Sequence, residues 1–189
     1  LLGGRFRIGH GILGVAAAAK IYPLVLLPVA LLWVGRKRGM REALICAGVF
    51  AAVVVACFLP FLILSPGGVA HSLGRQLGRP LQLEALGSSL LLAAHRLGLY
   101  EPTVSNSHGS QNLAGSLPDT LAAFQTAVQA VAVIVVWVLV AARDRGREGL
   151  LTASAAAVAA FVAFGKVLSP QFLIWLLPLV PVVAGTTGL

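Results

Sequence analysis

The sequence reads GVAAAAKIYPLVLLPVALLWV over residues 14–34 and AAFVAFGKVLSPQFLIWLLPLVPVV over residues 159–183. In each stretch a single lysine, Lys20 or Lys166, stands inside apolar sequence, and a proline follows within a few residues. A charge at the centre of a membrane helix costs about 3 kcal/mol on insertion scales, so it is rarely retained without a partner. The repeated arrangement therefore predicts one buried anionic group that both lysines face.

The composition is that of a polytopic helical membrane protein. Of the 189 residues, 58% are hydrophobic and only 11% are charged, which excludes an ordinary soluble domain. The formal charge of +8 does not indicate a nucleic-acid partner, because half of the 14 Lys and Arg residues lie in two short clusters, residues 35–42 and 142–149. Such clusters are typical of cytoplasmic loops. We therefore expect a multi-pass protein of the cell membrane.

Two segments are long and apolar enough to cross a membrane. Residues 44–64 and 121–142 carry no charge, and each is long enough to span a hydrocarbon core of about 30 Å. Residues 65–120 between them are polar and rich in glycine and serine, which indicates a loop-like region. With the basic clusters inside, this region lies on the extracytoplasmic face.

Two other segments are predicted to be broken. Residues 8–34 fit either one kinked span or two half-helices that meet near Lys20, and the second arrangement places the N-terminal arginines beside the first basic cluster. Residues 150–185 are too long for one span and predict a helical hairpin that turns around residues 165–171. By analogy the hairpin is preferred for residues 8–34 as well.

The expected fold class is all-α. We expect a single transmembrane helical bundle over residues 1–189, with broken half-helices. The chain opens at LLGGRFR without an initiator methionine or a signal peptide, so we expect a fragment of a longer membrane protein. Residues 81–98 predict one extracytoplasmic amphipathic helix, which would either lie flat on the membrane over the site or pack on neighbouring helices.

The segment around Lys166 has the chemistry of an anion site. Lys166 stands beside Ser169, Pro170 and Gln171, where a new helix is expected to begin, and a helix N-terminus offers unpaired N–H groups to an anion. The tetrapeptide KIYP (20–23) likewise places a lysine just before a proline, and Tyr22 adds a hydroxyl group. The candidate phosphate-binding residues are Lys20, Tyr22, Lys166, Ser169 and Gln171. Alternatively, each lysine reaches the interface or neutralises a helix end.

Three segments carry a resemblance to a known family: KIYP (20–23), RPLQLEALGSSLLLAAH (79–95) and GKVLSPQFLIWLLPL (165–179). They resemble the polyprenol-phosphate-mannose-dependent membrane mannosyltransferases of glycosyltransferase family 87. The first and last are also similar to the eukaryotic glycosylphosphatidylinositol mannosyltransferase I family. The resemblance implies the GT-C architecture and an extracytoplasmic active site. It also implies a polyprenyl-phosphate sugar as donor, a glycolipid or polysaccharide as acceptor, and no cofactor.

The resemblance also implies a catalytic acidic residue in the first extracytoplasmic loop, which would precede Leu1. The general base is therefore not assigned to any residue of this chain. Weaker candidates for acceptor binding are Arg79, Gln82, Glu84 and His108. For Glu84 a surface salt bridge or a helix-start charge is the competing role. No histidines or cysteines show the spacing of metal ligands, so no metal is expected.

Two other classes of protein fit part of this evidence. Helices broken at a charged residue are also found at the substrate sites of transporters, so a flippase of lipid-linked intermediates is possible. A non-catalytic membrane subunit, whose lysines pair with carboxylates of a partner, is the third class. Product formation in detergent would distinguish a transferase from a flippase, and copurification of a partner with an acidic helix would favour the subunit.

Overall fold

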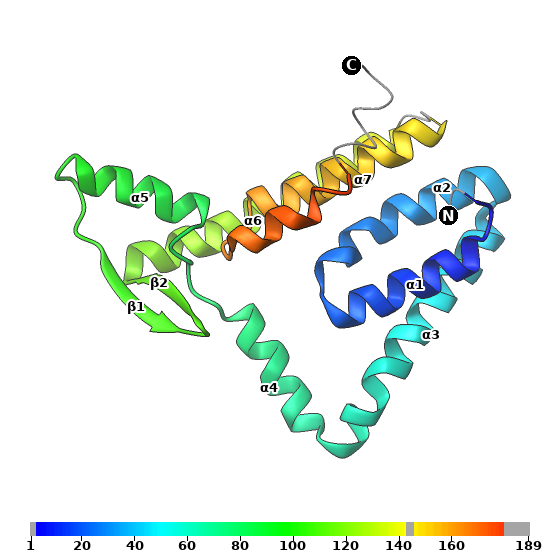
Figure 1. Cartoon of the computed structure of the whole chain (residues 1–189), viewed down its shortest axis with the longest axis horizontal. Helices are drawn as coiled ribbons and strands as arrows, with labels where there is room; N and C mark the ends of the chain where they lie inside the picture. Colours follow the sequence, from blue (N-terminus) through cyan, green and yellow to red (C-terminus); the bar gives the residue numbers. More distant parts are fainter. Residues whose placement is uncertain (1–2, 143–145, 180–189) are drawn as a thin grey trace.

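The computed structural model describes residues 3–142 and 146–179, and most of them are helical (Figure 1). The elements are, in order, α1 (Phe6–Ala19), η1 (Tyr22–Leu26), α2 (Leu27–Arg38), α3 (Met40–Leu64), α4 (Pro66–Leu77), α5 (Leu86–Arg96), β1 (Thr103–Ser107), β2 (Ser110–Ala114), α6 (Ser116–Ala142), α7 (Gly146–Ala163) and η2 (Pro170–Trp175), where η denotes a 3₁₀ helix.

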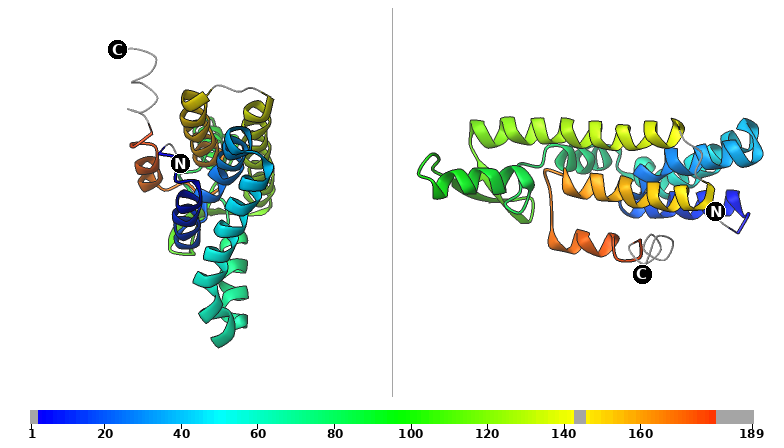
Figure 2. Two further views of the ribbon diagram at one scale, coloured as in Figure 1. Left: turned by 90° about the vertical axis from the view of Figure 1, so that its right-hand side faces the viewer. Right: turned by 90° about the horizontal axis from the view of Figure 1, so that it is seen from above.

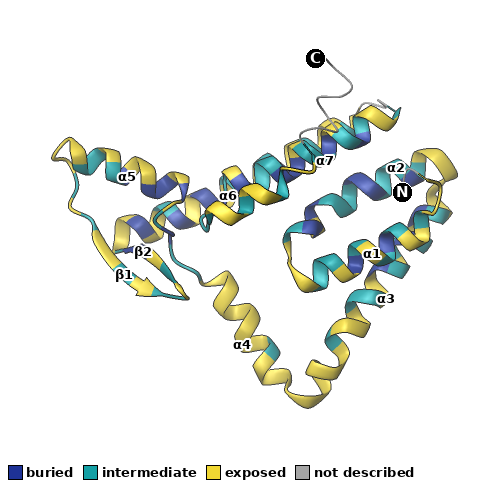
Figure 3. Ribbon diagram, viewed as in Figure 1, coloured by how far each residue is buried: buried dark blue, intermediate teal, exposed yellow. Residues whose placement is uncertain are grey.

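Two helices are long and apolar enough to cross a membrane. α3 has 25 residues and α6 has 27, with mean hydropathies of 2.7 and 2.2 in their most apolar windows. Only 6% and 11% of these windows are buried, whereas the core helix of a soluble protein is mostly buried. Figure 3 shows exposed surface along both helices, and on α3 it includes Val55, Leu59 and Phe61. These faces therefore require lipid or further protein around them.

Residues 8–34 form two helical segments that meet at Lys20. Lys20 closes α1 with an extended backbone, and its N–H donates to the carbonyl of Ala16 at 2.9 Å. Pro23 then stands in the first turn of η1, where its missing N–H costs no helical hydrogen bond. α2 runs back beside α1, so the start of α1 and the α2–α3 loop lie at the same end (Figure 1). There Arg7 forms a two-pronged ion pair with Glu42 of α3, at 2.8 and 2.9 Å.

The second break follows α7. α6 and α7 are antiparallel neighbours, and the chain turns after Ala163 and enters η2 at Pro170 (Figures 1 and 2). A buried apolar cluster joins these elements to η1. Its buried members are Val25, Val133, Ala157, Val158 and Val162. The last ten residues of the chain, which include the end of the predicted 150–185 hairpin, lie outside the described residues.

The region between the two long helices departs from the sequence-based expectation. The loop-like character expected there was wrong for α4 and for the antiparallel hairpin of β1 and β2, whereas α5 falls within the helix expected over residues 81–98. This hairpin also departs from the all-α class. A His108-Gly109 turn, with positive φ of 56° and 70°, closes it as type I′ turns do.

The helix predicted over residues 81–98 is shorter than expected and begins at Leu86. The preceding residues pair with β2 instead. The carbonyl of Leu81 accepts from Leu113 N at 3.0 Å, and Leu83 N donates to the carbonyl of Gln111 at 3.0 Å. This pairing satisfies backbone groups that a longer helix would have used internally.

Candidate functional site

The first broken segment is joined to η2 by aromatic stacking. The rings of Tyr22 and Trp175 stack with centroids 3.8 Å apart and planes inclined by 6°. Phe172 stacks on Trp175 as well, at 4.3 Å and 16°. The Nζ atom of Lys20 lies 5.4 Å from the centroid of the Trp175 ring, within the range of a cation–π interaction. Trp175 therefore holds the KIYP segment against the chain that follows Lys166.

The second junction joins Lys166 to the segment RPLQLE (79–84). The backbone carbonyl of Lys166 accepts a hydrogen bond from Gln82 N at 3.0 Å. Its Nζ atom donates to the carbonyl of Leu77, in the last turn of α4, also at 3.0 Å. A helix C-terminus favours a cation, so this contact stabilises both groups. It uses one of the three N–H donors of the ammonium group and leaves the others available to a ligand.

Both lysines thus lie at helix C-termini, Lys20 at α1 and Lys166 at α4. The predicted new helix after Lys166 is the six-residue η2, and the side chain of Ser169 makes no capping bond there. Gln171 is exposed. Within the described part of the chain, neither lysine forms an ion pair with a carboxylate.

The ends of α1 and α7 lie at the same end of the helical bundle, opposite the α2–α3 connection (Figure 1). The three segments that carried the family resemblance therefore meet at this end, through the contacts of Lys166 and Trp175. We call this group of contacts the lysine end of the bundle, defined by Lys20, Tyr22, Lys166 and Trp175.

A buried glutamine on α6 fixes the lysine end. Gln125 is 4% exposed. Its Nε2 donates to the carbonyl of Gly165 at 2.7 Å, and its Oε1 accepts from the N–H of Gly87 at 2.8 Å. One turn further on, Gln129 Nε2 donates to the carbonyl of Phe161 at 2.6 Å. The two amides therefore tie α5 and the turn after α7 to α6.

Sequence reasoning did not assign Gln125 or Gln129 to the site. The available signal was two amides four residues apart inside an apolar span, because polar side chains at that depth usually bond to a neighbouring segment. Their backbone partners are more than 30 residues away, which no local pattern reveals.

The candidate acceptor-binding residues gather around the hairpin, except for Glu84. Arg79 donates to Ser110 Oγ at 3.1 Å and to the carbonyl of His108 at 3.3 Å. Gln82 is 6% exposed, and its Oε1 has no hydrogen-bond partner among the described residues. Glu84 is exposed and forms no ion pair with a described residue. The hairpin and the 79–82 segment therefore form one polar surface, on which Glu84 has no partner.

The arrangement is suited to binding an anion and polar groups. The lysine end offers two cations and an aromatic stack, and the hairpin adjoins it through Gln82. Among the described residues, no group of three His, Cys, Asp or Glu side chains could hold a metal ion.

These features are those of a helical membrane protein with a cationic site at one end. The chain belongs to glycosyltransferase family 87, whose family model matches residues 1–170, and it is therefore a glycosyltransferase of a membrane-associated family. The resemblance drawn from the three motifs is confirmed. No curated protein and no solved structure matches the chain.

Proposed function

We propose that this glycosyltransferase transfers mannose from a polyprenyl phosphate to a glycolipid or polysaccharide acceptor. The reaction takes place on the extracytoplasmic side of the cell membrane, in a multi-pass protein of the GT-C architecture. One observation carries the proposal. Lys20 caps the end of α1 and Lys166 follows the end of α7, and these two helix ends lie at the same end of the bundle (Figure 1). Both lysines lie within the residues matched by the family model, and neither has a carboxylate partner among the described residues.

The donor phosphate supplies the missing negative charge. Two unit charges 4 Å apart attract by about 4 kcal/mol at an effective dielectric constant of about 20, which exceeds the roughly 1 kcal/mol found in bulk water. When the bond between the anomeric carbon and the phosphate oxygen breaks, the electron pair stays on that oxygen. Its negative charge therefore increases during the reaction. Cations already in place stabilise this charge without reorganisation.

The acceptor side of the reaction uses the polar surface near the hairpin. An acceptor hydroxyl attacks the anomeric carbon, and a general base takes its proton. Arg79, Gln82 and His108 lie together at the hairpin, and their side chains are the candidates for binding sugar hydroxyls. Glu84 is exposed and unpaired among the described residues, and we do not assign it the role of base.

The test is transfer by the full-length enzyme with polyprenyl-phosphate mannose as donor. Lys166→Ala and Lys20→Ala should each raise the KM for the donor about tenfold, the equivalent of about 1.4 kcal/mol, whereas Lys166→Arg should retain most of the affinity. Arg41→Ala is a matched control, because this exposed cation lies at the start of α3, at the other end of the bundle.

Unchanged transfer by both alanine variants would refute the proposed role of the lysines. A flippase makes no product in detergent, so product formed by the solubilised enzyme separates the two classes of protein. Membership in a glycosyltransferase family favours the transferase.

A further inference from the structure

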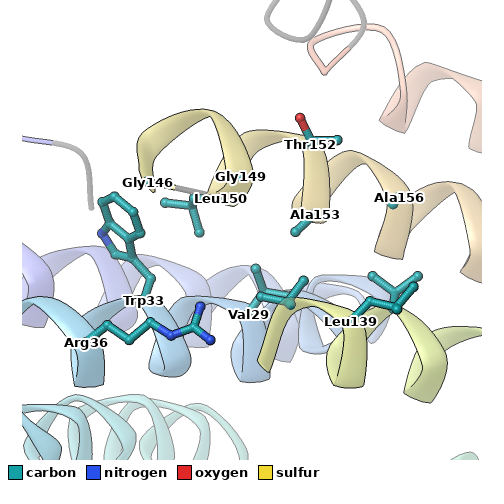
Figure 4. A pocket seen from close by; sticks show the side chains of 12 residues that line it. Val29, Trp33, Arg36, Leu139, Gly146, Gly149, Leu150, Thr152, Ala153 and Ala156 are labelled. Atoms are coloured by element: carbon teal, nitrogen blue, oxygen red, sulfur yellow. The ribbon is translucent and has the colours of Figure 1, made fainter. Parts of the chain in front are cut away.

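An apolar groove opens at the end of the bundle opposite the lysine end. It has a volume of about 200 Å³ and lies between α2, α6 and α7. Figure 4 shows Val29, Trp33 and Arg36 of α2 facing Leu150 and Ala153 of α7, with Leu139 of α6 beside them. Arg36 and Thr152 supply the polar side chains of its lining.

Small residues of α7 create the space. Gly146, Gly149, Ala153 and Ala156 line the groove at intervals of three and four residues, so they share one face of the helix. Part of an extended hydrocarbon chain fits in a groove of this volume.

Two cations, Arg36 and Lys37, lie beside the groove. Arg36 lines it and donates to the carbonyl of Ala141, at the end of α6, at 2.5 Å. Lys37 Nζ lies 5.1 Å from the ring centroid of Trp33, which lines the same groove. Arg38 ends the same turn of α2 but lies 5.8 Å from the ring centroid of Phe6 on α1, and Glu148 is the acidic residue in the first turn of α7. Among the described residues, Arg36 and Lys37 are thus the cations beside the groove.

We propose that this groove binds an anionic phospholipid of the cytoplasmic leaflet, with one acyl chain in the groove and the headgroup phosphate beside Arg36. Basic end loops mark the cytoplasmic side of a membrane protein, and basic pockets between helices on that side bind anionic headgroups. The site lies at the opposite end of the bundle from the proposed donor site, and its occupancy is measured without any sugar transfer.

The experiment uses Trp33 as the probe. The full-length enzyme is placed in nanodiscs that contain brominated phosphatidylglycerol or brominated phosphatidylcholine at equal mole fraction. The quenching of Trp33 is taken as the difference between the wild type and Trp33→Phe. We expect the anionic lipid to quench Trp33 with about fivefold higher apparent affinity than the zwitterionic lipid.

Two variants test the two halves of the site. Arg36→Gln keeps a donor for the carbonyl of Ala141 but removes the charge, so it should abolish the preference for the anionic lipid. Ala156→Leu places a larger side chain in the groove at an exposed position, so it should reduce quenching by both lipids. Ala130→Leu is the matched control, because Ala130 is exposed on α6 and does not line the groove.

Equal quenching by both lipids would overturn the proposal, because it indicates ordinary boundary lipid. Absence of Trp33 quenching by either lipid would also overturn it, since other protein would then cover the groove. A preference that survives both Arg36→Gln and Ala156→Leu would place the anionic lipid elsewhere.

Discussion

Replacing Gln125 by leucine keeps the approximate volume of the side chain but removes both of its hydrogen bonds. The N–H of Gly87 and the carbonyl of Gly165 then stay buried without a partner. A buried group left unsatisfied costs about 1–3 kcal/mol, whereas hydrogen bonds between membrane helices average only about 0.6 kcal/mol, with a maximum near 1.7. For the two bonds together we expect a loss of about 2–3 kcal/mol.

The assay is the apparent Tm of the full-length enzyme in detergent. For chains of 150–250 residues, 1 kcal/mol corresponds to roughly 2–4 °C, and to less in a longer chain, so Gln125→Leu should lower the Tm by up to about 12 °C. Gln129→Leu is the internal comparison, because it removes one hydrogen bond and should have about half the effect. Since Gly165 precedes Lys166, Gln125→Leu should also raise the KM for the donor more than Gln129→Leu does.

Equal Tm values for Gln125→Leu and the wild type would show that the amide does not hold the two segments together. Destabilisation with an unchanged KM for the donor would leave Gln125 a purely structural role. In that case the position of Lys166 would not depend on this contact.

Two further substitutions test other contacts of the same end. Gly87→Ala should destabilise the protein by about 1–3 kcal/mol, because its Cβ would lie 2.6 Å from the Gln125 side chain. Gly48→Ala, whose Cβ would meet only its own helix backbone among the described residues, should be neutral or slightly stabilising. Equal Tm values for the two variants would refute this. Tyr22→Leu removes the stack on Trp175 and should lower the Tm by the equivalent of about 0.5–1.5 kcal/mol. Tyr22→Phe keeps the ring and should lower the Tm by much less. Equal losses in both variants would instead assign the contribution to the hydroxyl.

The helical and apolar character of the chain could be predicted because it depends on composition and run length. The two long helices, α3 and α6, contain the stretches expected to span the membrane, residues 44–64 and 121–142. The hairpin of β1 and β2 could not be recognised in the same way. Its strands are short and rich in Ser and Asn, and residues 81–83, which pair with β2, were expected to belong to a helix.

The residues that contact the candidate site residues could not be predicted from the sequence either. The carbonyl of Leu77, which accepts from Lys166, lies 89 residues away in the chain. The stacking of Trp175 on Tyr22 likewise joins segments from opposite ends of the sequence. Local patterns identified the unusual residues, because a lysine in an apolar stretch stands out. Only the fold shows that a carbonyl and an indole ring, rather than carboxylates, surround these lysines among the described residues.

The contacts of the two lysines with a carbonyl and an indole ring, rather than with carboxylates, decide how these lysines are interpreted. A cation at a helix C-terminus gains about 0.3–1 kcal/mol from the helix, and a cation–π contact adds about 0.5–1 kcal/mol at an exposed site. Each lysine costs about 3 kcal/mol if it lies at membrane depth. These contacts offset at most about two thirds of that cost for Lys20 and about one third for Lys166. The proposed donor, a polyprenyl phosphate, would offset the remainder if its anionic group were shared by both lysines.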